Sequence, residues 1–121
     1  MSMEIMNPEE LITTIERGDI KFNKLKELIS RNNVGYINEY GNTALITACI
    51  YDKSYIALEL IKTGKSKPEH INNDGNNALF FAFKHRMKDV AFELIKIKNN
   101  YKNDKNDKIK MMVELYWKMY L

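Results

Sequence analysis

Few side chains in this sequence belong to the usual catalytic or metal-binding types: one cysteine, Cys49, and two histidines, His70 and His85. Metal sites place such ligands at short spacings such as C-x-x-C or H-x-x-x-H, and neither spacing occurs here. A cysteine nucleophile would need His85 within hydrogen-bond reach of Cys49, but the predicted helix pattern points Cys49 inward and His85 outward. We therefore expect no metal, no cofactor and no enzymatic activity.

The remaining candidate groups also have structural explanations. The five glycines stand singly and form no phosphate-binding loop, and the carboxylates of Glu9 and Glu10 suit the first turn of a helix. Lysines at 65–67 and in the loop 98–110 could contact phosphates. In KNDKNDK, however, lysine alternates with aspartate, and no aromatic residues interleave with the basic ones. Nucleic-acid binding is thus an alternative, not the leading expectation.

Bulk composition predicts a single soluble domain. The chain has 121 residues, is 45% hydrophobic and 29% charged, and carries a net charge of +3, which is typical of globular proteins. A lone cysteine permits no intramolecular disulfide. The beginning of the chain does not resemble a signal peptide, and no apolar run approaches the roughly 20 residues of a membrane span. We expect an intracellular protein that is neither secreted nor membrane-bound.

A nine-residue phrase occurs twice in the sequence and indicates an internal repeat. GNTALITAC at 41–49 returns as GNNALFFAF at 75–83, an offset of 34 residues. The same offset relates Leu60-Ile61 to Leu94-Ile95, and Ile37-Asn38 to Ile71-Asn72. An offset held over such a length is the signature of a repeat architecture, whose units bury their apolar faces against their neighbours.

Each unit can be interpreted from its turn and helix signals. INEYGNT and INNDGNN are rich in Asn, Asp and Gly, which tolerate the positive φ of tight turns. Thr43 and Asn77 follow as predicted helix N-caps, and Gly64 is placed to end a helix. Leu45 and Leu79 should be fully buried. The expected helices are 44–51, 54–63, 78–86 and 88–98.

A hairpin turn followed by a short and a longer helix, repeated about every 33 residues, resembles the ankyrin repeat. The first-helix signature of that family, T-P-L-H-x-A, corresponds to TALITA at 43–48 and NALFFA at 77–82. Alanine replaces the proline, and Ile46 or Phe80 replaces the histidine. We therefore expect the hydrogen bonds of that histidine to be missing and packing to take over their role.

The resemblance implies an all-α solenoid with capping elements at both ends. LITTIERGDIKFNKLKELISRNN matches a first unit without its hairpin, with a helix at 8–17. Residues 107–121 predict a capping helix whose stripe includes Met112 and Tyr116 and should contact Phe83, while Trp117 is either part of the cap or an exposed partner contact. The expected organisation is one domain over 1–121, with a capping repeat at 8–34, repeats at 35–68 and 69–101, and the capping helix at 107–121.

The resemblance implies a non-enzymatic module that binds a protein through its hairpin tips and the concave face of its short helices. Tyr40 and Tyr51 are the best candidates for dominant contacts. Self-assembly is a further alternative, although we expect a monomer. The phrases ALELIKTGKSKPEHINNDGN and GNTALI, with the many A/T-rich codons that Lys, Asn, Ile and Tyr imply, are similar to ankyrin arrays of giant DNA viruses of amoebae. The predicted contact residues are Glu16, Arg17, Glu39, Tyr40, Asn42, Ile50, Tyr51, Asn73, Asp74, Asn76, Lys84 and His85.

Overall fold

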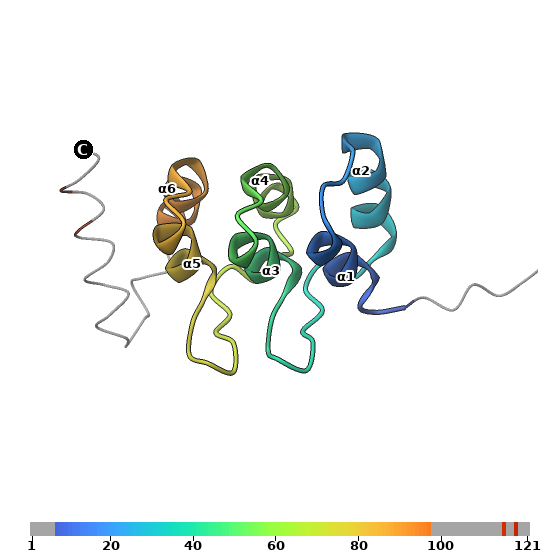
Figure 1. Ribbon diagram of the computed structural model, residues 1–121, viewed down its shortest axis with the longest axis horizontal. Helices are drawn as coiled ribbons and strands as arrows, with labels where there is room; N and C mark the ends of the chain where they lie inside the picture. Colours follow the sequence, from blue (N-terminus) through green and yellow to red (C-terminus); the bar gives the residue numbers. More distant parts are fainter. Residues whose placement is uncertain (1–6, 98–114, 116–117, 119–121) are drawn as a thin grey trace, which may run out of the picture.

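The computed structural model describes residues 7–97, together with Leu115 and Lys118. Residues 7–97 form three pairs of antiparallel helices that stack side by side (Figure 1). The short first helices α1, α3 and α5 make one row, the longer helices α2, α4 and α6 make the other, and two hairpin loops extend below the short helices. The helices are α1 (Glu10–Arg17), α2 (Phe22–Arg31), α3 (Ala44–Ile50), α4 (Ser54–Lys62), α5 (Ala78–Lys84) and α6 (Lys88–Lys96).

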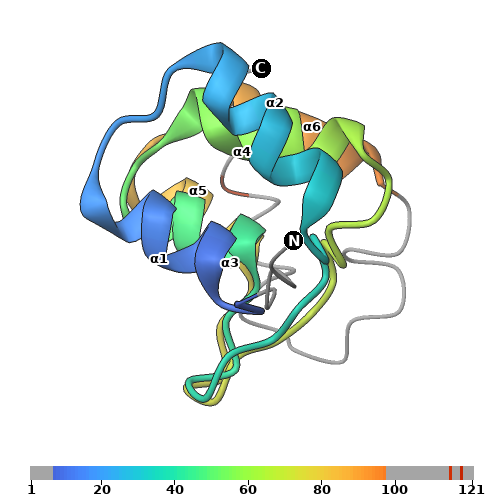
Figure 2. The same ribbon diagram turned by 90° about the vertical axis from the view of Figure 1, so that its right-hand side faces the viewer.

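Viewed along the stack, the pairs superimpose and the two hairpins lie over one another (Figure 2). The repeat predicted from the offset of 34 is therefore a repeat in space. An all-α repeat solenoid, the predicted fold class, is confirmed. None of the helices in the described ranges is long and apolar enough to cross a membrane.

The predicted N-caps fix where the two regular short helices begin. The Thr43 hydroxyl accepts from the Ile46 N–H at 3.1 Å, and the Asn77 side-chain oxygen accepts from the Phe80 N–H at 2.9 Å. Each cap satisfies one backbone donor that a helix start leaves without a partner. Both predicted caps are confirmed.

The turns between paired helices explain why the helices are shorter than predicted. Asp52 and Arg86 follow α3 and α5 with φ of 58° and 56°, a left-handed conformation that ends an α-helix and disfavours side chains with a Cβ. The predicted helices at 44–51 and 78–86 therefore end at Ile50 and Lys84. In the first unit the same position is Gly18.

Three other predicted helix bounds also differ by one or two residues. The first helix begins at Glu10 rather than at residue 8, and α4 ends at Lys62 before a turn completed by Gly64, whose φ is 70°. α6 ends at Lys96, because Ile97 takes an extended backbone conformation. Of the predicted capping helix at 107–121, only Leu115 and Lys118 are described, and both are helical and exposed. The predicted contacts of Phe83 and the position of Trp117 lie outside the described residues.

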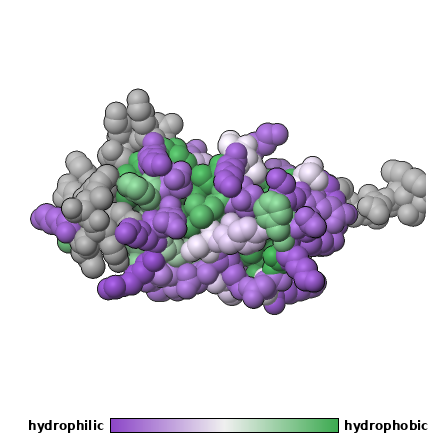
Figure 3. Space-filling view, turned by 90° about the horizontal axis from the view of Figure 1, so that it is seen from above, coloured by the Kyte–Doolittle hydropathy of each residue, from purple (hydrophilic) through white to green (hydrophobic). Residues whose placement is uncertain are grey.

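The core lies between the two rows of helices and is continuous through all three pairs. Leu45 and Leu79 are completely buried, as predicted, at equivalent positions of α3 and α5. Ala48 and Ala82, one turn later, are also completely buried, and their small side chains let neighbouring helices approach closely. Figure 3 looks onto the α2, α4 and α6 row, where apolar surface shows between polar side chains.

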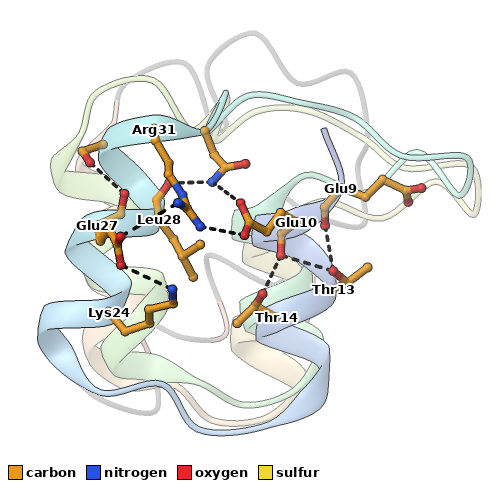
Figure 4. Close-up of polar contacts among 10 residues, drawn as sticks. Glu9, Glu10, Thr13, Thr14, Lys24, Glu27, Leu28 and Arg31 are labelled. Carbon is orange, nitrogen blue, oxygen red and sulfur yellow. Dashed lines mark hydrogen bonds and ion pairs between the residues drawn. The ribbon is translucent and has the colours of Figure 1, made fainter. Parts of the chain in front are cut away.

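The first helix pair is held together by a polar cluster (Figure 4). The Arg31 guanidinium of α2 donates to the Glu10 carboxylate of α1 at 2.8 Å, and the Asn32 side chain donates to the same carboxylate at 3.3 Å. The Thr13 and Thr14 hydroxyls donate to backbone carbonyls one turn earlier. The Arg31–Glu10 contact is a charge-assisted hydrogen bond that joins α2 to α1.

Candidate protein-binding surface

Two hairpins of the same design form the projecting edge of the stack. In the first, the Asn38 side-chain oxygen accepts from the backbone N–H groups of Tyr40 and Asn42 at 3.0 and 2.9 Å. In the second, Asn72 accepts from the N–H groups of Asp74 and Asn76 at 3.0 Å each. Each asparagine thus satisfies the backbone donors of its own loop, which gives both tips one defined shape.

Four hydrogen bonds connect the first hairpin to the second. The backbone N–H of Asn73 donates to the Tyr40 carbonyl at 3.1 Å, and its side-chain amide donates to the Glu39 carbonyl at 2.9 Å. The other two join Asn72 Nδ2 to Asn42 Oδ1 at 2.9 Å and His70 Nε2 to the Gly41 carbonyl at 3.0 Å. We call these four bonds the inter-hairpin ladder.

The ladder adds to one prediction. The replacement of the family histidine by Ile46 and Phe80 led us to expect that its hydrogen bonds would be missing and that packing would take over their role. Polar contacts between repeats are also supplied at the hairpins, where His70 Nε2 donates to the Gly41 carbonyl. The sequence feature that could have indicated these contacts is HINND at 70–74, where His, Asn and Asp lie within a single turn segment.

Gly41 is where the two hairpins approach most closely. Its φ is 80°, and a Cβ at this position would lie 2.5 Å from Asn73 Oδ1 and 2.7 Å from Asn73 N. Gly75 has nearly the same φ, 83°, but a Cβ there would meet nothing within 4 Å. Gly41 is therefore required by both conformation and space, and Gly75 by conformation alone.

The predicted contact residues fall on the hairpin tips and on the ends of the short helices. Tyr40 is 63% exposed at the first tip, and Tyr51 is 46% exposed just after α3. Six other predicted contact residues, on the hairpins and the short helices, also have exposed side chains: Glu16, Arg17, Glu39, Asn73, Asp74 and Lys84. The helix-end positions recur every 34 residues, so Arg17, Tyr51 and His85 occupy equivalent places along the stack.

Five predicted contact residues have structural roles as well. Asn42 and Asn73 belong to the ladder, and Ile50 is half-buried against the core. His85 is half-buried, and its N–H donates to the Phe81 carbonyl at 2.9 Å as the C-cap of α5. Asn76 is also half-buried, and its carbonyl closes the second hairpin. The backbone at His85 and Asn76, and the side chains of Asn42 and Asn73, are therefore held in place before any partner arrives.

Two apolar side chains at the hairpins were missed by the sequence reasoning. Ile37 and Ile71 precede the buried Asn38 and Asn72, and both are exposed. Their signal was available, because the repeated I-N pair lies in a turn segment where no helix could bury the isoleucines. Together with Tyr40 they add apolar area to a loop region that is otherwise polar.

The chemistry of Cys49 is that of a core residue. Its side chain is completely buried, and desolvation, with a smaller contribution from the Asp52 carboxylate, raises the pKa of the thiol to about 12. A nucleophilic cysteine needs the opposite shift. Among the described residues, no three His, Cys, Asp or Glu side chains converge as metal ligands would.

Comparison with known proteins agrees with this geometry. A family described as ankyrin repeats, in three copies, matches residues 11–108. Searches of curated proteins and of solved structures find no significant match. The matched range includes both hairpins and nearly all of the three helix pairs. The chain belongs to the ankyrin-repeat family.

Proposed function

We propose that this protein binds a protein partner through its hairpin tips and the exposed ends of α1, α3 and α5. Ankyrin repeats are in general protein-interaction modules without catalytic activity. The observation that carries the proposal for this surface is the pair Tyr40 and Tyr51, which remain exposed on a scaffold that is already ordered. Aromatic side chains of this kind dominate the binding energy of many interfaces.

Preorganisation supports the same surface. The inter-hairpin ladder holds the two tips in one arrangement, so a partner need not order them on binding. Less conformational entropy is then lost on association. The charges along the surface are mixed, with acidic Glu16, Glu39 and Asp74 beside basic Arg17 and Lys84. A protein surface with both charge signs fits this pattern better than a phosphate backbone does.

We further propose a viral source and a host-cell setting. The repeat phrases and the lysine-, asparagine- and isoleucine-rich composition support an ankyrin protein of a giant DNA virus of amoebae. A buried, protonated thiol at Cys49 is compatible with a reducing host cytoplasm. The partner would then be a host or viral protein, bound by a monomer.

The test is affinity purification from amoebal host lysate with three full-length variants. Tyr40→Ala and Tyr51→Ala should each weaken capture of the partner. Asn23→Ala is the control, since this exposed side chain lies on α2 in the other helix row. A partner that is retained by both surface variants would refute the proposed surface, and a partner lost only with Asn23→Ala would assign binding to the other helix row.

A further inference from the structure

A groove lies between α4 and α6, in the helix row away from the hairpins. Its volume is about 420 Å³, within the usual range for sites that hold a ligand or a cluster of side chains. Tyr55, Leu58 and Ile61 of α4 and Phe92 of α6 supply its apolar lining. Figure 3 faces this row and shows apolar surface between the polar side chains.

The aromatic residues of this row keep much of their surface exposed. Tyr55 is 43% and Phe92 38% exposed, and Phe22 of α2, at 50%, extends the strip with its ring centroid 6.1 Å from that of Tyr55. The outward side of a surface helix is normally polar. A contiguous exposed apolar strip with a polar rim is a mark of an interaction site.

The charges on the rim of the groove are of both signs. Glu59, Asp89, Glu93 and Lys62 line it. Lys62 pairs with Glu59 at 3.0 Å, and Lys96 pairs with Glu93 at 3.1 Å and lies 5.4 Å from the centroid of the Phe92 ring. Within the part of the chain that the structure describes, Asp89 pairs with no cation.

Charges of both signs also reach Tyr55. Desolvation and the Glu59 carboxylate raise the pKa of the Tyr55 hydroxyl, while Lys62 opposes them. An occupant that complements this groove brings apolar side chains for the lining and a positive charge for Asp89. The phosphates of a nucleic acid would be repelled by Asp89.

We propose that the α4/α6 groove binds a short amphipathic helix of a protein partner, whose apolar side chains enter between Tyr55 and Phe92 and whose lysine or arginine approaches Asp89. An amphipathic helix laid into a groove uses apolar anchors at i, i+3 or i+4, and i+7. The groove is a second docking surface, separate from the hairpin tips.

The experiment is selection of a displayed library of 16-residue helical peptides on the full-length protein, followed by fluorescence anisotropy with an enriched peptide. The enriched sequences should combine apolar residues at helical spacing with an excess of lysine and arginine. Asp89→Lys should weaken binding about tenfold, the size expected when one close charge pair is reversed. Tyr55→Ser should weaken it similarly, and Tyr40→Ser should leave it unchanged.

A charge-exchange experiment distinguishes the loss of a specific contact from simple unfolding of a variant. A peptide whose basic residues are replaced by glutamate should bind the Asp89→Lys protein better than it binds the unmodified protein. The proposal is overturned by enriched peptides that are acidic, by binding that both groove variants retain, or by selection that yields no groove-dependent peptide. It is also overturned if sedimentation shows that two copies of this chain occupy each other's grooves.

Discussion

Replacement of Gly41 by alanine tests the inter-hairpin ladder quantitatively. The left-handed φ of 80° costs an alanine about 1–2 kcal/mol relative to glycine. The new Cβ would also lie 2.5 and 2.7 Å from two atoms of Asn73, so the second hairpin must move away. That movement breaks the bonds from Asn73 to the Tyr40 and Glu39 carbonyls, each with a net contribution of about 1 kcal/mol.

The sum for Gly41→Ala is a loss of roughly 3–4 kcal/mol in the free energy of unfolding. Gly75→Ala is the matched control, because its φ is similar and nothing lies within 4 Å of the added carbon. It should lose only the conformational part, about 1–2 kcal/mol. The two variants should therefore differ by roughly 2 kcal/mol.

The assay is urea unfolding followed by circular dichroism at the helix band. If a variant is partly unfolded in water, a stabilising osmolyte is added to restore the folded-state baseline from which its unfolding is measured. Combining Gly41→Ala with Asn73→Ala should recover part of the loss, because one of the two close atoms is removed and the sites are in contact. Equal destabilisation by Gly41→Ala and Gly75→Ala would refute the close approach of the hairpins.

Three further predictions concern the core and the helix ends. Leu45→Ala or Leu79→Ala should lower the unfolding free energy by about 2–5 kcal/mol, and an unchanged melting temperature would show that the repeat register is wrong. Cys49, with a thiol pKa raised to about 12 from 9.0, should react with a thiol reagent only when the chain opens. Between pH 9 and 12 the thiol of the unfolded chain loses its proton before that of the folded chain, so the free energy of unfolding should fall as the pH rises. This fall should be less steep in Cys49→Ala. Arg86→Gly, at a φ of 56°, should raise stability by about 0.5–1 kcal/mol, measured against Asp52→Gly as the equivalent change in the preceding repeat.

The repeat and its core could be predicted because their signals are local or periodic. Thr43 and Asn77 are N-caps by residue type and position alone, and the burial of Leu45 and Leu79 follows from one offset applied to an apolar pattern. The left-handed turn at Arg86 could not be predicted, because no local signal places an arginine there. Arg86 lies in the turn between α5 and α6, where the chain reverses direction.

The ladder and the groove depend on neighbours that are distant in the sequence. His70 contacts Gly41 only because two hairpins of the same shape are stacked. Tyr55 and Phe92 line one groove only because of the register between α4 and α6. Residue types suggested polar turns and amphipathic helices, but the distances between them are set by the stack.

The central claim, that a protein partner contacts the hairpin tips and short-helix ends, is tested most directly by site-specific photo-crosslinking. A benzophenone amino acid is placed at Tyr40, at Tyr51 or, as the control on the other helix row, at Asn23 of α2, and the full-length protein is irradiated with its captured partner. We predict covalent partner adducts from Tyr40 and Tyr51. Adducts from Asn23 alone would contradict the claim.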